Sequence, residues 1–380
     1  MFINDAIFQL LHYYKGEVMI NILKIASAFI GAVLGAGFSS GQEVLQYFTS
    51  HGINGVWGAL VVAVFFGIMG MLLVRIGFRL QATSHQEVIQ QITGPFLSKV
   101  FDIILMLTLF GIGVVMLAGA GPIFNQQFGI PTYVGTLLMT LLVLLTIMIG
   151  VEKIVRVIAF ITPVFLLIII FINIYSAVPI KISFENLEAM AVQQNSISGN
   201  WFFSAVNYLS VITLTNAAML FIMGGNESKE KHALFGGLLG GFFCGLLVLI
   251  STLALYANID VVAGVQIPTL VLANQMSPLF GLIFSISLFG MIYSTAVSLF
   301  FSFNSRFFEP RTKKFNSFSV ITLVVAFSLG LYGFSDLVSI VFPLVGYMGM
   351  AFIVIIIIAS LKLNQTIKAM SSSSQNEASL

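Results

Sequence analysis

Charged residues and cysteine are both scarce in this chain. Only 8% of its 380 residues are Asp, Glu, Lys or Arg, and there are four histidines and one cysteine, Cys244. A single cysteine excludes a disulfide framework, and so little His and Cys argues against a zinc or redox-metal site. The net charge of +2 is too small to indicate a nucleic-acid-binding protein.

Apolar residues, in contrast, make up 58% of the chain, and the mean hydropathy is +1.05. A water-soluble core of this size cannot bury so much apolar surface. The apolar runs are about 20 residues long, which suits helices that cross a bilayer, whereas barrel strands alternate over about 10 residues. We therefore predict an all-α integral membrane protein surrounded by the lipid bilayer.

Charged residues, glycine, proline and short polar clusters divide the apolar sequence into ten predicted spans. Residues 1–19 have no pattern of a secretory signal and are predicted to be a cytoplasmic arm, with Met1 or Met19 as the start. Residues 20–361 form one transmembrane domain, and 362–380 a disordered tail. The predicted spans are 20–49, 56–80, 99–124, 132–150, 154–176, 200–224, 233–257, 278–306, 316–334 and 336–361.

Lys and Arg residues test this count, because they gather in cytoplasmic loops. With both termini inside, 15 of the 16 basic residues fall on the cytoplasmic side and Lys181 alone falls outside. One missed or extra helix would destroy this division for every later loop. The sequence therefore predicts a multi-pass protein of the bacterial plasma membrane with both termini in the cytoplasm.

Spans 1 and 6 differ from the others because polar and glycine residues interrupt them. Span 1 contains "GAGFSSGQ" from Gly35 to Gln42, and span 6 carries Ser210, Thr213 and Thr215 at its middle. Five spans separate their starts, so the halves 20–176 and 200–361 are inverted with respect to each other. Matching interrupted helices in inverted halves mark the binding site of secondary transporters. We expect helices 1 and 6 to be discontinuous.

The glycines of span 1 predict where its helix unwinds. Gly35 and Gly37, on either side of Ala36, each cost roughly 1 kcal/mol relative to alanine in a helix. Amides after the break, near Ser39, favour an anionic group such as a carboxylate, and carbonyls before it, near Leu34, favour a cation.

Close packing is the alternative explanation for such glycines. It does not account for the Ser, Gln and Glu residues that follow them in span 1. In span 7, however, Gly237, Gly241 and Gly245 form one row without polar neighbours. For that span we predict that the row packs closely against another helix.

Glu43 is the one acidic residue that falls deep within a predicted span. An intramembrane carboxylate is costly and indicates a functional role, here as proton carrier or as partner of a substrate ammonium or sodium ion. The alternative is that Glu43 lies near the outer water level and caps the entrance. Its neighbour Gln42 and, in span 10, Tyr347 beside Pro343 are further coupling or gate candidates, although Pro343 also fits a simple packing kink.

Span 8 supplies the hydroxyl groups of Ser294 and Thr295, which are hard oxygen ligands suited to sodium. The string Gly37-Phe38-Ser39-Ser40-Gly41 also matches the GxSxG pattern of serine hydrolases. That pattern requires a strand-turn-helix elbow and a nearby histidine, and all four histidines fall in termini or loops. We therefore expect no enzyme.

The motif "GAGFSSGQE" near the N-terminus of a ten-span protein resembles the YkvI-like family of bacterial membrane proteins. That family is similar to the amino acid, polyamine and organocation transporters, which have the LeuT-type fold of five plus five inverted helices. The resemblance implies a substrate between the breaks of spans 1 and 6, and a sodium site built from carbonyls of Gly31 and Leu34 with the hydroxyls of Ser294 and Thr295. Phe38 stands where sodium-coupled carriers often have Asn, which argues against a second sodium site.

Together these features predict an ion-coupled secondary active transporter of a small solute, an amino acid or related zwitterion. Spans 1, 2, 6 and 7 would move against spans 3, 4, 8 and 9. We expect Na⁺ or H⁺ as coupling ion, no other cofactor and no protein partner. A receptor or sensor using the same pocket is the alternative, but the short cytoplasmic loops argue against it.

The predicted substrate-binding residues are Gly35, Ala36, Gly37, Ser39, Ser210, Thr213 and Thr215; the ion-binding residues are Gly31, Leu34, Ser294 and Thr295; the coupling or gate residues are Gln42, Glu43 and Tyr347.

Overall fold

The computed structural model describes all residues except 1–18, 32, 34, 150–151, 178–182 and 378–380. Every regular element among the described residues is a helix. After a first helix, Met19–Gly31, the elements are α2 (Ala36–Ser40), α3 (Gln42–Tyr47), η1 (Thr49–His51), α4 (Ile53–Arg79), α5 (His85–Phe128), α6 (Thr132–Ile149), α7 (Glu152–Ala177), α8 (Phe184–Ala191), α9 (Trp201–Gly225), α10 (Glu230–Ala257), α11 (Ile259–Val262), α12 (Pro268–Met276), α13 (Pro278–Asn304), α14 (Lys313–Gly330) and α15 (Phe334–Glu377).

Each of the ten predicted spans overlaps at least one helix in the described part of the chain. Among the described residues, seven helices are long and apolar enough to cross a membrane: α4, α5, α6, α9, α10, α13 and α15. Two boundaries differ from the prediction. α5 begins at His85 and includes a kink at Gly94, whose φ is +79°. α15 continues to Glu377 instead of giving way to a disordered tail, because no glycine or proline follows Gly349 to end the helix.

Span 1 is interrupted. Its first helical part includes Met19–Gly31 and Val33. Gly35 is extended with ψ −177°, and α2 and α3 follow as short helices separated by Gly41. Gly41 has a φ of +81°, a left-handed conformation that glycine adopts readily and other residues rarely do. The chain is therefore helical on both sides of the glycine-rich motif and irregular within it.

Span 6 is not interrupted, and the predicted break in it is wrong. α9 is one continuous helix of 25 residues that begins where Asn200 caps the amides of Phe202 and Phe203. The hydroxyl groups of Thr213 and Thr215 donate to the carbonyls of Leu209 and Val211, one turn earlier. Polar side chains in membrane helices are often satisfied in this way. They therefore do not require the helix to open.

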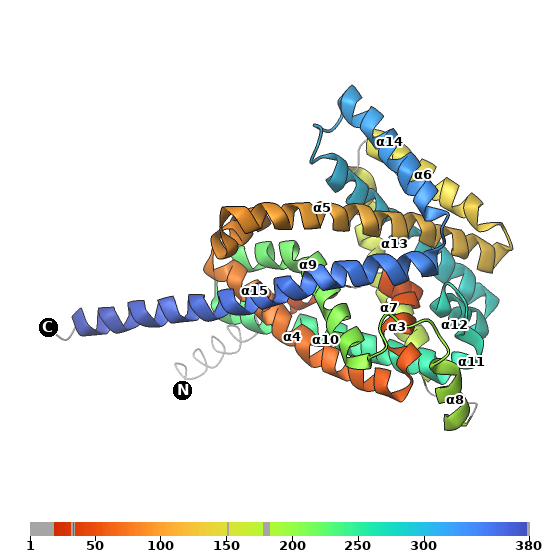
Figure 1. Cartoon of the computed structure of the whole chain (residues 1–380), viewed down its shortest axis with the longest axis horizontal. Helices are drawn as coiled ribbons and strands as arrows, with labels where there is room; N and C mark the ends of the chain where they lie inside the picture. The colour runs from red at the N-terminus through yellow and green to blue at the C-terminus, as the bar shows by residue number, and fades with distance from the viewer. Residues whose placement is uncertain (1–18, 32, 34, 150–151, 178–182, 378–380) are drawn as a thin grey trace, which may run out of the picture.

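The helices pack in two groups. One contains α4, α9 and α10, and the other contains α5, α6, α13 and α14. α15 packs on both α9 and α5 and crosses the molecule between the groups (Figure 1). α7 contacts α10 of one group and α13 of the other. Of the spans predicted to move together, 2, 6 and 7 lie in the first group, and spans 3, 4, 8 and 9 form the second.

Glycine allows α4 and α10 to approach until their backbones touch. A Cβ atom on Gly241 would collide with the carbonyl oxygen of Phe66, and one on Gly237 with the carbonyl oxygen of Gly70. Gly245 lies equally close to Ala63. The prediction that this row of glycines packs against another helix is therefore confirmed, and the neighbouring helix is α4.

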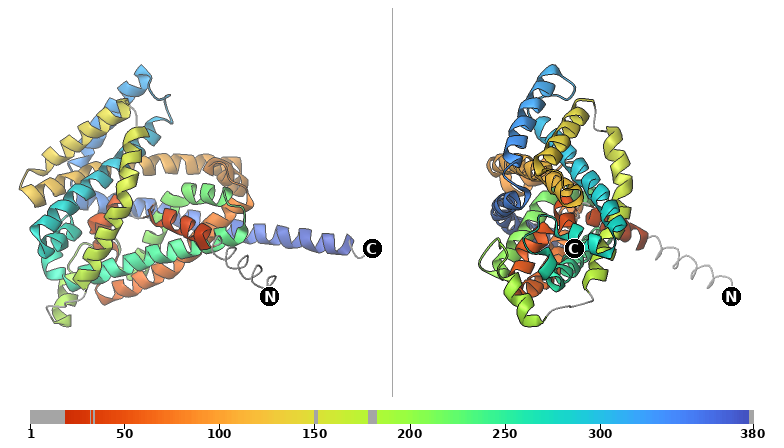
Figure 2. Two further views of the ribbon diagram at one scale, coloured as in Figure 1. Left: turned by 180° about the vertical axis from the view of Figure 1, so that it is seen from behind. Right: turned by 90° about the vertical axis from the view of Figure 1, so that its right-hand side faces the viewer.

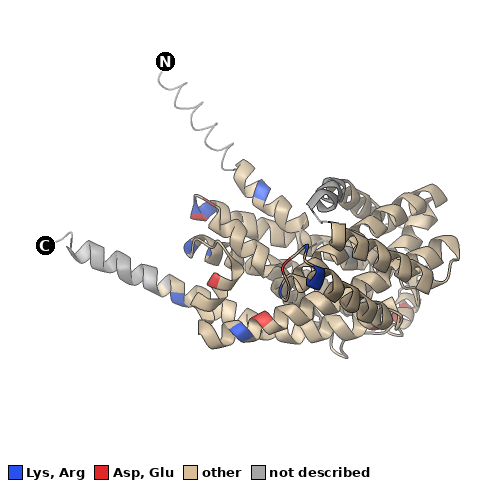
Figure 3. Cartoon of the chain, turned by 90° about the horizontal axis from the view of Figure 1, so that it is seen from above, with Lys and Arg blue, Asp and Glu red and all other residues tan. Residues whose placement is uncertain are grey.

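The first helix and the C-terminal part of α15, which lead to the two termini, point toward the same end of the molecule (Figures 2 and 3). Lys and Arg residues lie mainly toward that end (Figure 3). There, one carboxylate oxygen of Glu230 lies 2.7 Å from Nε of Arg75 and 2.8 Å from a terminal nitrogen of Arg79. This ion-pair cluster fastens α10 to α4 beside the glycine contact.

We expect Gly241→Ala to destabilise the protein although alanine favours helix by roughly 1 kcal/mol. The added methyl group must push α10 away from the Phe66 carbonyl, which costs about 1 to 3 kcal/mol. Gly290→Ala in α13 is the matched control, because a Cβ there has nothing within 4 Å. Thermal unfolding in detergent should show a lower midpoint for Gly241→Ala alone. Equal midpoints would contradict the close contact.

Candidate functional site

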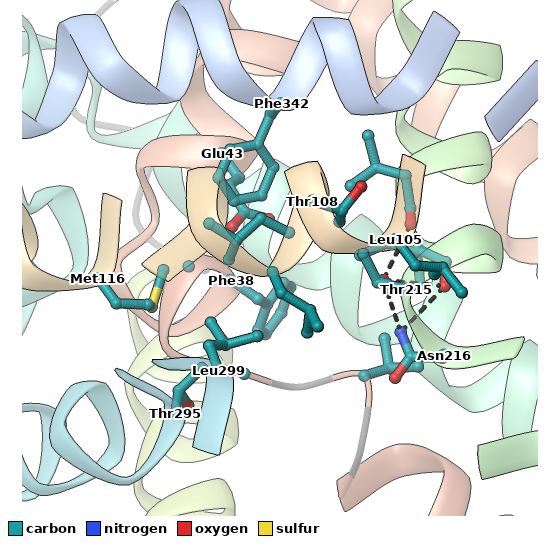
Figure 4. Close-up of a pocket in the computed structure, with 17 residues that line it drawn as sticks. Phe38, Glu43, Leu105, Thr108, Met116, Thr215, Asn216, Thr295, Leu299 and Phe342 are labelled. Atoms are coloured by element: carbon teal, nitrogen blue, oxygen red, sulfur yellow. Dashed lines mark hydrogen bonds between the residues drawn. The ribbon is translucent and has the colours of Figure 1, made fainter. Parts of the chain in front are cut away.

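A cavity of about 220 Å³ lies beside the break in span 1, between the two packing groups (Figure 4). Span 1, α5, α9, α13 and α15 all contribute to its wall, and most of that wall is apolar. The lining residues are Val33, Gly35, Gly37, Phe38, Glu43, Leu105, Thr108, Leu109, Ile112, Met116, Val211, Ile212, Thr215, Asn216, Thr295, Leu299 and Phe342.

Glu43 is the one ionisable residue among those that line the cavity. Its side chain is only 3% exposed, and the carboxyl group lies directly against Gly37, where a Cβ atom would occupy the position of Oε1. Among the residues that the structure describes, none forms an ion pair with it. Glu43 therefore faces the central cavity and does not cap an outer entrance.

Neutral polar groups occupy other parts of the wall. On α9, the side-chain amide of Asn216 donates to the Ile212 carbonyl at 2.9 Å and to the Thr215 hydroxyl at 3.1 Å. On α5, the Thr108 hydroxyl donates to the Ile104 carbonyl. Figure 4 shows Thr215 and Asn216 on one side of the cavity and Thr295 on another, with Glu43 beside Phe342.

The structure brings three of the predicted substrate-binding residues to the cavity, namely Gly35, Gly37 and Thr215. Ala36 begins α2, but its side chain lies outside the described residues. The other predictions do not reach the wall. Ser39 donates to the Gly35 carbonyl at 2.9 Å, and in the same way Ser210 and Thr213 donate to carbonyls of their own helix.

Only one of the four predicted ion-binding residues lines the cavity, Thr295. The Ser294 hydroxyl donates instead to the Met291 carbonyl at 3.0 Å. Gly31 is not among the residues that line the cavity, and Leu34 lies outside the described residues. The two hydroxyl groups predicted to act together therefore have different surroundings.

Gln42 lies outside the cavity, where it joins span 1 to the start of α15. Its side-chain amide lies 2.6 Å from the Ser335 hydroxyl. With its oxygen toward Ser335, the same amide donates to the Val265 carbonyl at 3.1 Å and accepts from Gln46 at 2.9 Å. Gln46 also donates to the Ser335 carbonyl at 3.0 Å. These bonds close the molecule at the end opposite the termini (Figure 1).

Tyr347 does not line the cavity. Its side chain is 48% exposed, and its ring lies 6.1 Å from that of Phe203. The α15 residue that does line the cavity is Phe342, next to Pro343. The prediction therefore found the correct part of span 10 but chose a residue on another face of its helix.

Sequence reasoning missed most of the wall, including Thr108, Met116, Leu299 and Phe342. These residues lie on apolar helices where nothing in the sequence separates a residue at a cavity from one in a packed interface. Asn216 was detectable, because an amide within a membrane span is costly unless it has partners.

Ser39 lacks the surroundings of a hydrolase nucleophile. It lies within the short helix α2, is fully buried, and donates to a backbone carbonyl. Among the described residues, His51 contacts Ser204 and His85 contacts Arg306, so neither activates Ser39. The GxSxG match is therefore a coincidence of composition.

The fold is that of the LeuT-type transporters. The structure of MhsT in complex with L-phenylalanine matches with a TM-score of 0.58 over 87% of this chain and 88% of that chain, at 16% identity. A manganese transporter of Eremococcus coleocola matches with a TM-score of 0.54 over 88% of this chain and 78% of that chain, at 15% identity. These neighbours are transporters and not enzymes, as predicted for this chain.

Sequence relatives confirm the resemblance to the YkvI-like membrane proteins. The membrane protein YkvI of Bacillus subtilis is 29% identical over 332 residues, 87% of this chain and 93% of the relative. YyaD of the same organism is 22% identical over 333 residues, 87% of this chain and 94% of the relative. No protein-family model matches the chain.

The contact between Gly37 and Glu43 predicts a strong energetic coupling between them. Gly37→Ala should destabilise the protein by about 1 to 3 kcal/mol, because its methyl group displaces the Glu43 carboxyl. The same change should cost much less in a Glu43→Ala background. A double-mutant cycle from denaturant unfolding measures this difference. Additive effects of the two substitutions would show that Gly37 and the Glu43 carboxyl group do not touch.

Proposed function

We propose that this protein is an ion-coupled secondary active transporter of a small organic solute with an amine group, within the class of amino acids and related compounds predicted from the sequence. The observation that carries the proposal is the cavity at the break of span 1, with a buried carboxyl group in its wall. A buried carboxylate without a counter-ion is costly and is retained where a proton, ion or substrate binds.

The position of the cavity supports alternating access. Its wall combines residues of span 1 and α9 with residues of α5 and α13, which belong to different packing groups. A small rotation of one group against the other would open the cavity toward one side of the membrane and close it toward the other. Fold similarity to transporters agrees with this mechanism.

We propose that the end carrying the termini is cytoplasmic and that the chain crosses the bacterial plasma membrane ten times. The gathering of Lys and Arg toward that end supports this orientation. The contact of Gln42 and Gln46 with Ser335 then lies on the extracellular side and acts as an outer gate. A small polar space of about 100 Å³ adjoins this gate.

The gate predicts a measurable effect of Gln46→Ala. Each hydrogen bond stabilises the closed gate by about 1 kcal/mol. Losing one therefore raises the fraction of molecules whose outer gate is open about fivefold. In a Cys244→Ala background, a cysteine replacing Met116 in the cavity wall should react correspondingly faster with an impermeant thiol reagent added outside. Gln90→Ala is the control, because Gln90 is exposed on α5 away from the gate. An unchanged rate in Gln46→Ala would remove the gate role.

Protons are the proposed coupling ion. Glu43 is the titratable group of the cavity wall. Of the predicted sodium ligands that the structure describes, Thr295 alone lies in that wall, and Ser294 is bonded to its own helix. A proton requires one carboxyl group, but sodium requires several oxygen ligands.

In proteoliposomes, we expect a proton gradient to drive solute accumulation and a sodium gradient alone to drive none. Glu43→Gln should abolish accumulation because the amide cannot release a proton, while Thr295→Val should retain it. Ser287→Ala serves as control, because Ser287 bonds only its own helix outside the cavity. Sodium-driven accumulation that survives Glu43→Gln would refute proton coupling, and binding without flux would refute transport.

A further inference from the structure

When its carboxyl group is ionised, Glu43 gives the cavity an unbalanced negative charge. Among the residues that the structure shows lining it, there is no Lys, Arg or His. The Arg75 and Arg79 side chains do not line it and are bonded to Glu230 at the end of α4. An anionic solute would therefore enter this space against the field of a buried carboxylate.

The position of that carboxylate matters as much as its charge. From the sequence, the segment after the break in span 1 is the expected place for a solute carboxylate. In the structure, the Glu43 carboxyl group lies against Gly37 in that segment. A solute carboxylate there would lie next to Glu43, and two like charges about 4 Å apart repel by several kcal/mol in a partly desolvated site.

Among the described residues, the remainder of the wall offers no cationic partner for a solute carboxylate. Thr215 and Asn216 are neutral, and their donor groups already bond carbonyls or each other within α9. Phe38, Leu299 and Phe342 bring large apolar side chains to the same space. The complementary solute has one cationic group directed at Glu43 and an apolar body.

We propose that the transported solute is a small apolar amine without a carboxylate group, and that Glu43 takes the place of the carboxylate that an amino acid would bring. This inference rests on the proposed function and narrows its substrate class. The ammonium group donates hydrogen bonds to the Glu43 carboxylate, and the apolar body fills the space lined by Phe38, Leu299 and Phe342. A proton and the amine occupy the same carboxylate in turn.

Matched pairs of solutes test the proposal in proteoliposomes. 2-Phenylethylamine differs from phenylalanine, and 3-methylbutylamine from leucine, only by the carboxylate. We expect each amine to be taken up, and to inhibit uptake of the other, at concentrations about tenfold or more below those of its amino acid. Preference for the amino acids would overturn the substrate assignment while leaving the transport function intact. Absence of gradient-driven flux for all four solutes would overturn both.

Variants at position 43 separate charge from shape. Glu43→Gln should weaken amine binding, measured by calorimetry on the purified protein, by about tenfold or more because the ion pair is lost. Glu43→Ala also vacates the space beside Gly37 and should shift the preference toward the amino acid of each pair. Asp260→Asn is the matched control, because Asp260 is an exposed carboxylate on α11. Amine affinity equal in Glu43→Gln and wild type would refute the pairing.

Discussion

Lipid cannot form hydrogen bonds with a broken helix, and the rest of this structure follows from that constraint. Span 1 is not regular helix at Gly35 and again at Gly41, so its amides and carbonyls there must find partners inside the protein. Two serines supply some of them, since Ser39 donates to the Gly35 carbonyl and Ser40 to the Gly37 carbonyl at 2.7 Å. The surrounding helices enclose the remainder, and the cavity is the space left between them.

The same constraint explains why α9 stays whole. A hydroxyl that bonds a carbonyl one turn earlier needs no outside partner, so a helix rich in Ser and Thr can remain regular in a bilayer. Glycine acts differently, because it leaves the backbone free to adopt the left-handed conformation seen at Gly41. The cavity is therefore bordered by one broken helix, span 1, and one intact helix, α9.

The fold was largely predictable from the sequence, whereas only part of the site was. Span positions depend on long apolar runs and on the charge of the loops, which are strong signals in a membrane protein. Gly35, Gly37 and Glu43 were found because glycine and a carboxylate are costly in lipid. Ser294 and Thr213 were wrongly placed at the cavity, because a helical hydroxyl bonded to its own backbone has the same sequence signature as one that binds an ion. The apolar wall gave no signal at all.

The central claim is that the Glu43 carboxyl group faces the cavity and binds the solute there. Labelling with an apolar carbodiimide, followed by mass spectrometry of the peptides, tests it most directly. The account predicts that Glu43 is modified in the membrane-embedded protein and that 2-phenylethylamine protects it, while exposed carboxylates such as Asp260 are unaffected by the amine. Modification of Glu43 at the same rate with and without solute, under conditions where the solute is transported, would contradict it.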